Sequence, residues 1–167
     1  LFRSPRAKCN LYNIGCEVAL VARWPGRIQP GRVVEDFTSL MDLAPTFLEA
    51  AGETPPACMS ARSLLPVLTS KEDGQVDPDR TSVVTGRERH VAGAREGHLP
   101  YPQRSLRTKD FLYILNFAPD RWPMGDPQGM DDLSAAPIAF EKLREDTWAA
   151  YPDFDASPTK AWMIHHR

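Results

Sequence analysis

The fold is decided by Arg6-Ala7-Lys8-Cys9-Asn10-Leu11-Tyr12-Asn13-Ile14-Gly15 and the run directly after it, Glu17-Val18-Ala19-Leu20-Val21-Ala22-Arg23-Trp24-Pro25-Gly26. The first part has the composition of an irregular loop that carries a basic side chain. The second is an apolar run rich in Val and Leu and stopped by Trp-Pro-Gly, which predicts a strand covered on both faces. Lys8 then lies at a strand edge, where binding groups are commonly presented, and the alternative is an ordinary solvated lysine.

This segment resembles the sulfatase family, in which a loop of the type Gly-Lys-x-Thr-x-Tyr-Glu-x-Gly precedes a strand that ends in Trp-Pro-Gly. The matching places are occupied by Lys8, Tyr12, Gly15 and Trp24-Pro25-Gly26. The likeness continues through Ser39-Leu40-Met41-Asp42-Leu43-Ala44-Pro45-Thr46 and Arg62-Ser63-Leu64-Leu65-Pro66-Val67-Leu68. The nearest branch is the N-sulfoglucosamine sulfohydrolase (heparan sulfamidase) type, which Lys8-Cys9-Asn10-Leu11-Tyr12 and Tyr101-Pro102-Gln103-Arg104-Ser105 resemble specifically.

The resemblance implies an α/β chain, namely the C-terminal fragment of an alkaline-phosphatase-like sulfatase fold that ends in a small antiparallel β-sheet packed with a helix. Residues 1–80 are expected to form the incomplete end of the large α/β domain. Residues 81–167 are expected to form its last strand and a truncated C-terminal α+β subdomain. Because its strands need the upstream sheet, the isolated chain is expected to expose apolar surface.

Size and composition fit a globular chain. The 167 residues are 42% hydrophobic and 25% charged, which is typical of a packed domain rather than a disordered one. The formal net charge of −2 gives no electrostatic reason to expect nucleic acid or an anionic membrane as partner. No apolar run approaches the roughly 20 residues that span a bilayer.

The three cysteines, Cys9, Cys16 and Cys58, show no paired metal-binding spacing. The segment Cys58-Met59-Ser60-Ala61-Arg62 imitates the sulfatase signature Cys-x-Pro-x-Arg, whose cysteine becomes the formylglycine nucleophile. Ser60 replaces the proline, however, and the segment follows the Lys8 loop instead of preceding it. We therefore interpret it as a coincidence in a loop.

Local patterns predict several elements along the chain. A helix begins near Asp42, tolerates Pro45 in its first turn and stops at Gly52. Its apolar face, expected in the core, consists of Leu43, Phe47, Leu48 and Ala51. Residues 81–86 predict a strand, 104–117 a hairpin around Thr-Lys-Asp, 138–150 a helix, and 157–167 a helix or strand.

Three residues are candidates for the site. The resemblance implies that Lys8 neutralises charge on the sulfate oxygens, with its ammonium supplying three donors as a point charge. It also places His90 near the substrate pocket, where an imidazole can hydrogen-bond a sugar hydroxyl or balance an anion; the alternative is a solvated loop histidine. Glu88 is the third candidate, accepting from sugar hydroxyls or, alternatively, pairing with Arg87 or Arg89. Arg104 is expected to brace the hairpin entry.

The resemblance implies a Ca²⁺ ion and a formylglycine nucleophile in the full-length enzyme, with neither the metal ligands nor the nucleophile in this chain. The expected partners are a sulfated saccharide substrate and the missing N-terminal part of the same protein, with no nucleic acid and no membrane span. The family suggests a periplasmic, secreted or lysosomal location. Two other functions stay open: a phosphonate- or phosphate-ester hydrolase of the same superfamily, and a noncatalytic carbohydrate-binding module.

Overall fold

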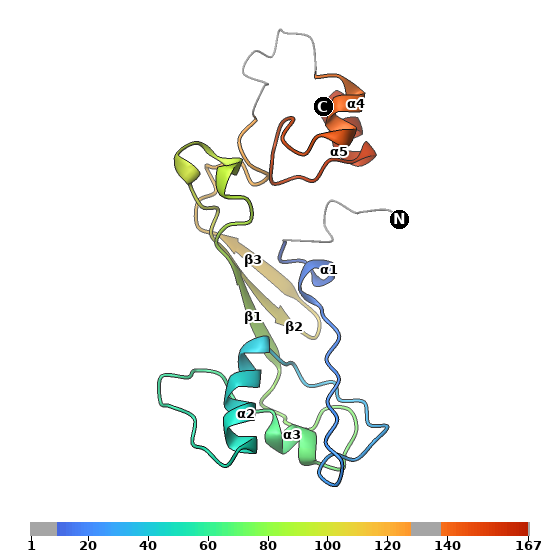
Figure 1. Cartoon of the computed structure of the whole chain (residues 1–167), viewed down its shortest axis with the longest axis vertical. Coiled ribbons are helices and arrows are strands. Elements are labelled where there is room, and N and C mark those ends of the chain that lie inside the picture. The colour runs from blue at the N-terminus through green and yellow to red at the C-terminus, as the bar shows by residue number, and fades with distance from the viewer. Residues whose placement is uncertain (1–9, 128–137, 167) are drawn as a thin grey trace. The chain divides into compact units, whose positions relative to one another are not determined.

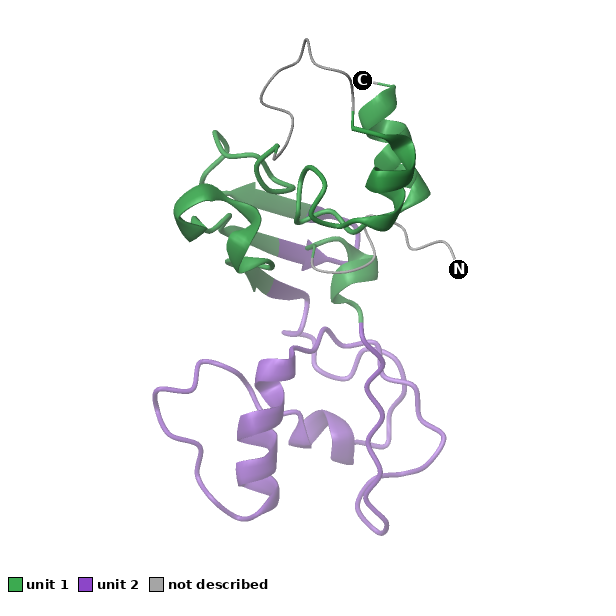
Figure 2. Ribbon diagram, turned by 45° about the horizontal axis from the view of Figure 1, so that its top comes forward, with its two compact units in different colours: residues 1–17, 85–105, 113–167 green, residues 18–84, 106–112 purple. Residues whose placement is uncertain are grey.

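The computed structural model describes residues 10–127 and 138–166, which fall into two compact units (Figures 1 and 2). Unit 1 contains residues up to 17, 85–105 and those from 113 onward, and unit 2 contains 18–84 and 106–112. The domain boundary expected at residue 80 stays a prediction.

Unit 2 contains the helix that was predicted to run from Asp42 to Gly52, and a second, shorter one. A 3-10 turn, η1 (Leu40–Asp42), leads into α2 (Leu43–Ala50), and α3 (Leu65–Thr69) packs nearby. The N-terminal cap is Ser39, which forms a capping box with Asp42: the Ser39 hydroxyl accepts from the Met41 amide, and the Ser39 amide donates to Asp42. Gly52 ends the helix with a φ of 84°, as predicted.

The face of α2 that is buried differs from the predicted one. Pro45 and Thr46 are buried, whereas Phe47 is 66% exposed. The Thr46 hydroxyl donates to the Asp42 carbonyl at 2.6 Å and accepts from the Leu64 amide at 2.7 Å, which fixes this side of the helix inward. The expectation that Phe47 lies in the core is therefore wrong for this structure: on the predicted face Phe47 and Ala51 are exposed, and Leu43 and Leu48 are half-buried.

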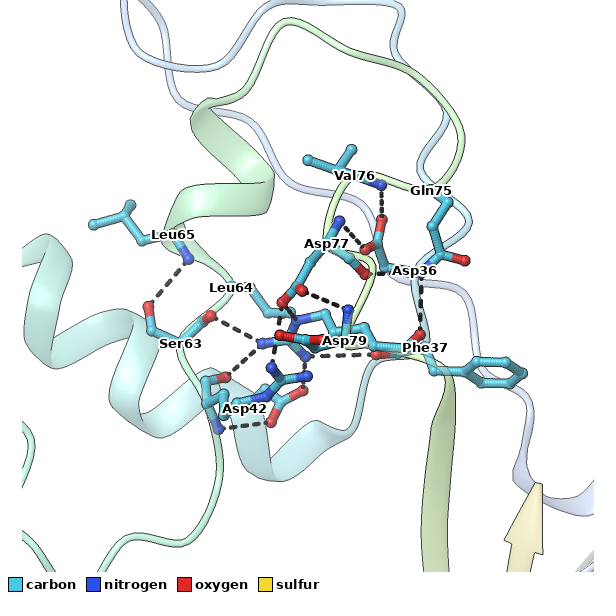
Figure 3. Close-up of polar contacts among 12 residues, drawn as sticks. Asp36, Phe37, Asp42, Ser63, Leu64, Leu65, Gln75, Val76, Asp77 and Asp79 are labelled. Carbon is cyan, nitrogen blue, oxygen red and sulfur yellow. Dashed lines mark hydrogen bonds and ion pairs between the residues drawn. The ribbon is translucent and has the colours of Figure 1, made fainter. Parts of the chain in front are cut away.

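A buried ion pair lies at the start of α2 (Figure 3). Nη1 of Arg80 lies 2.8 Å from Oδ2 of Asp42, and both side chains are almost fully buried. The guanidinium also pairs with Asp77 at 3.3 Å and donates to the carbonyls of Arg62 and Ser63. These bonds tie the helix start to two loops that are far apart in sequence.

Residues 17–24 form no strand, contrary to the expectation of a buried one. Val18 is 64% exposed and Val21 is 90% exposed. The reason is physical: a strand exists only by hydrogen bonding to a neighbour, and the described chain supplies none here. The extended segment near Val33 makes only an isolated parallel bridge, between Val34 and Gly74.

The predicted strand and hairpin form one three-stranded sheet with the order β1-β2-β3 (Figure 1). Its strands are β1 (Ser82–Arg87), β2 (Gln103–Thr108) and β3 (Leu112–Asn116). The hairpin turn is closed by the Thr108 amide donating to the Phe111 carbonyl at 2.9 Å, and by the Phe111 amide donating to the Thr108 hydroxyl at 3.1 Å. This confirms the small antiparallel sheet; the helix expected to pack on it stays a prediction.

The remaining helices belong to unit 1. A single turn, α1 (Asn13–Cys16), occupies the start of the described chain, and the 3-10 turns η2 (Ala92–Ala94) and η3 (Glu96–His98) follow β1. Two helices near the C-terminal end, α4 (Phe140–Glu145) and α5 (Pro158–His165), pack on one another. Their shared core consists of Leu143, Ala149, Ala150, Ala161 and Ile164.

Candidate functional site

The polar run that leaves β1 converges on one buried carboxylate, that of Asp153. Its side chain is 1% exposed, although it lies in a loop more than sixty residues further along the chain. Nη2 of Arg87 lies 3.1 Å from Oδ2, and Nη1 of Arg95 lies 3.2 Å from the same oxygen. The other oxygen, Oδ1, accepts from the Val91 amide at 3.0 Å. This carboxylate thus joins the end of β1, the following loop and the C-terminal segment.

His90, one of the predicted site residues, belongs to this cluster. Its Nδ1 lies 3.5 Å from Oδ1 of Asp153, and 24% of its side chain is exposed. Both Nδ1 of His90 and Nε of Arg87 are buried and have no hydrogen-bond partner in the described part of the chain. Buried polar atoms are normally satisfied, so two such atoms on residues three positions apart are an unusual feature of this cluster.

The cluster carries an excess of positive charge. Two guanidinium groups share one carboxylate, and the imidazole adds a third cation when it is protonated. Arg95 is further held by the carbonyls of Trp122 and Pro123 and by the ring of Tyr101, 5.2 Å from its guanidinium carbon. Such an arrangement is suited to an anionic ligand, because fixed cations in a partly buried place interact strongly with negative charge.

The loop that contains Asp153 is held in place by hydrogen bonds from a buried lysine. Lys160, on α5, has no exposed surface, and its Nζ donates to the carbonyls of Thr147 at 2.8 Å, Tyr151 at 3.4 Å and Phe154 at 2.9 Å. Burial lowers the pKa of Lys160 to about 8, while the nearby carboxylates Asp146 and Asp155 oppose that effect.

The same loop contains two consecutive residues in the left-handed region, Ala150 with a φ of 55° and Tyr151 with a φ of 43°. For residues with a side chain this conformation costs on the order of 1 kcal/mol each. The surrounding contacts therefore impose the shape of this loop, and backbone strain of this kind is concentrated at functional sites.

Glu88 is engaged by a partner that the sequence did not predict. Its Oε1 lies 2.5 Å from Nη2 of Arg104, instead of pairing with Arg87 or Arg89. Arg104 lies on β2, with its guanidinium over the ring of Phe117 and its side chain against Gly86. The contact matches the expected bracing role of Arg104, and Glu88 remains more than half exposed.

Lys8, the predicted sulfate-binding cation, lies outside the described residues. Asp153 and Arg95 were missed by sequence reasoning. Neither lies in a periodic pattern or a short motif, and only the fold brings them beside His90. The one available signal is the density of ionisable groups in Arg87-Glu88-Arg89-His90, which indicates a polar site at this strand end.

The two cysteines in the described part of the chain, Cys16 and Cys58, are free thiols. Cys58 is exposed in a turn, and the interpretation of its segment as a coincidence stays a prediction. Cys16 donates to the Asn10 carbonyl at 3.4 Å, and burial raises the pKa of its thiol, with a hydrogen bond to Thr85 opposing. A raised pKa keeps the thiol protonated, which makes it a poor nucleophile.

Comparison with known proteins defines the class. The sequence profile of the family described as "N-sulphoglucosamine sulphohydrolase, C-terminal" matches residues 7–126. The chain belongs to this family and is a sulfatase-related C-terminal region.

Individual relatives agree with this class. An ulvan-active sulfatase of Formosa agariphila is 34% identical over 110 residues, covering 66% of this chain and 21% of the relative. A steryl-sulfatase of Mus musculus is 41% identical over 114 residues, covering 67% of this chain and 17% of the relative. A solved structure of a protein in complex with its substrate D-glucosamine-2-N,6-O-disulfate matches with a TM-score of 0.46 and 30% identity, covering 55% of this chain and 18% of that one. The chain thus spans about a fifth of the length of these relatives.

The described residues offer no ligand set for the metal that the family implies. No group of three or more His, Cys, Asp or Glu side chains lies close enough to hold an ion within 10–127 and 138–166. Over the same residues, no helix has the length and apolar character that crossing a membrane requires.

Proposed function

We propose that this chain is the C-terminal part of a sulfatase that hydrolyses sulfate esters or N-sulfate groups of sulfated sugars, to which it contributes a sulfate-binding lysine and substrate-pocket residues. The observation that carries the proposal is the family match over residues 7–126, which includes both the Lys8 loop and His90. The cationic cluster at the end of β1 supports it, because a sulfated substrate is an anion.

The proposed roles follow from charge and reach. Lys8 neutralises the sulfonyl oxygens, and a compact ammonium tolerates their change of geometry during hydrolysis. His90 contacts the substrate with the exposed part of its ring. Glu88, which stays more than half exposed while paired with Arg104, accepts from a sugar hydroxyl at the rim.

The nucleophile and the metal belong to the upstream part of the complete protein in this proposal. Calcium would supply charge neutralisation at the sulfonyl oxygens, and the described residues here do not hold it. The residues of this chain bind and orient the substrate. On its own, the chain is expected to release no sulfate.

The missing upstream part is also the proposed structural partner. The extended run 18–21 and the uncovered side of α2 with Phe47 present apolar groups to solvent. An unpaired extended run accepts a neighbouring strand, and an uncovered helix face accepts apolar cover. Producing residues 1–167 with and without the upstream sequence tests this, since only the complete protein is expected to be soluble and to resist binding of a hydrophobic dye.

The activity itself is tested by offering the complete protein 4-nitrophenyl sulfate, a 4-nitrophenyl phosphonate ester, glucosamine 6-sulfate and glucosamine N-sulfate. We expect turnover of at least one of the three sulfated compounds, and a kcat/KM for the aryl sulfate above that for the aryl phosphonate. Phosphonate preference would favour the other superfamily activity. Binding of the sugars with no turnover of any compound would favour a noncatalytic module.

A further inference from the structure

A second residue acts on the substrate through His90. We propose that Asp153 is a positioning residue that orients the His90 ring, so that Nδ1 faces inward and Nε2 is presented to the sulfated substrate. This inference rests on the proposed substrate-binding role of His90.

The orientation of the ring follows from which of its atoms are buried. Nδ1 is buried and lies 3.5 Å from Oδ1 of Asp153, yet 24% of the side chain is exposed. The exposed surface therefore belongs to the rest of the ring, and Nε2 is the only other polar atom there. Among the described residues nothing forms a hydrogen bond with Nε2. It is the ring atom that is free to reach a ligand.

The distance suits a contact that tightens when the ligand is bound. At 3.5 Å the pair is an ion pair for a protonated ring, and it is longer than an ideal hydrogen bond. Catalytic hydrogen bonds are often long without substrate and shorten in the complex. A carboxylate behind one ring nitrogen fixes which nitrogen carries the proton and where the other one points.

Asp153 is itself held too firmly to follow the ring. Two guanidinium groups bind Oδ2, and the Val91 amide binds Oδ1. Its loop is fixed by the three carbonyl contacts of Lys160. The carboxylate therefore has a fixed position, against which the His90 ring is oriented.

The test uses the complete protein and the compound that the wild type turns over best among 4-nitrophenyl sulfate, glucosamine 6-sulfate and glucosamine N-sulfate. The variants are His90→Ala, Asp153→Asn and the double variant. The matched control is Asp126→Asn, because the Asp126 carboxylate also accepts from a loop amide, that of Glu96, without facing His90.

We expect His90→Ala and Asp153→Asn each to raise KM by about 10- to 100-fold, with kcat changed less, as for other residues that orient a ligand-binding histidine. The double variant should be no worse than His90→Ala alone within about threefold, because both changes remove the same contact. Asp126→Asn should behave as the wild type. The inference is overturned if Asp153→Asn leaves KM unchanged, or if its effect multiplies with that of His90→Ala.

Asp153→Asn also weakens the contacts to Arg87 and Arg95, so its fold is checked by circular dichroism. Should it fail to fold, His90→Gln replaces it, since the glutamine amide retains a donor near Nε2 and has no group at Nδ1. A wild-type KM for His90→Gln would contradict the positioning role. If the wild type turns over none of the three compounds, the proposed function has failed separately. The crystal structure of the complete Asp153→Asn protein then decides: an unchanged His90 ring overturns the inference, and a rotated ring supports it.

Discussion

The buried ammonium of Lys160 makes the stability of the complete protein depend on pH in a predictable direction. Burial lowers the pKa of Lys160 to about 8, whereas an unfolded lysine titrates near 10.5. Between these values the unfolded chain binds more protons than the folded one, so the free energy of unfolding rises as the pH increases from about 8 to about 10.5. At about 1.4 kcal/mol per pKa unit, the gain is at most about 3.5 kcal/mol. Three carbonyl acceptors favour the charged form, which makes this an upper bound.

The assay is equilibrium urea unfolding of the complete wild-type protein and of Lys160→Met, measured at intervals from pH 7 to 10.5. Other titrating groups are common to both proteins, so the difference between the two isolates Lys160. We expect the free energy of unfolding of the wild type, minus that of Lys160→Met, to increase as the pH rises. Lys142→Met, which changes an exposed lysine on α4, is the control and should show no such trend. A flat difference for Lys160→Met would refute the claim that the ammonium is buried beneath the Asp153 loop.

Two further predictions concern stability. Asp42→Ala leaves the buried Arg80 guanidinium without its closest carboxylate and should lower the free energy of unfolding by about 3 kcal/mol in the same urea titration. The control Asp79→Ala, at an exposed residue, should change it by less than about 0.5 kcal/mol. Equal effects would show that the ion pair is not buried. Gly52→Ala and Gly125→Ala both force a side chain into the left-handed region, but a Cβ at 52 meets open space while one at 125 would lie 2.9 Å from the Ala94 carbonyl oxygen. Thermal melting should therefore show a loss of about 1 kcal/mol for Gly52→Ala and a clearly larger one for Gly125→Ala, and the reverse order would contradict the packing around Gly125.

Sequence reasoning predicted those elements whose signals are local. The hairpin around 108–111 is closed by hydrogen bonds within its own turn. Gly52 ends a helix through its own left-handed backbone conformation, which does not depend on distant residues. The strand at 81–86 was also predicted, and of the two alternatives left open for 157–167, a helix or a strand, the structure has the helix.

The expectations that were wrong depended on partners elsewhere. Residues 17–24 have the composition of a buried strand, yet a strand needs a neighbour that the described chain does not provide. Phe47 has helical spacing for a core face, but the bonds of Thr46 turn the other side inward. The helix predicted over 138–150 is limited to Phe140–Glu145, because the backbone is extended at Asp146 and left-handed at Ala150.

The candidate site was predicted only in part for the same reason. His90 was a candidate because the family resemblance placed it near the substrate pocket, and that role stays a prediction. Asp153 lies more than sixty residues away in a loop without a motif, so no local pattern connects it to His90. The burial of Lys160 could not be predicted from the sequence, because a lysine is ordinarily a surface residue. Only the three carbonyls around it explain its burial.

We propose that Lys8 is the cation that holds the sulfate group in the complete protein. The most direct test is the kcat/KM of the complete protein carrying Lys8→Ala, with Lys109→Ala in the exposed hairpin turn as control. The account predicts a loss of about 100- to 1,000-fold for Lys8→Ala and none for Lys109→Ala, since removing one charge-stabilising group commonly costs that much. Wild-type turnover by the Lys8→Ala protein would contradict it.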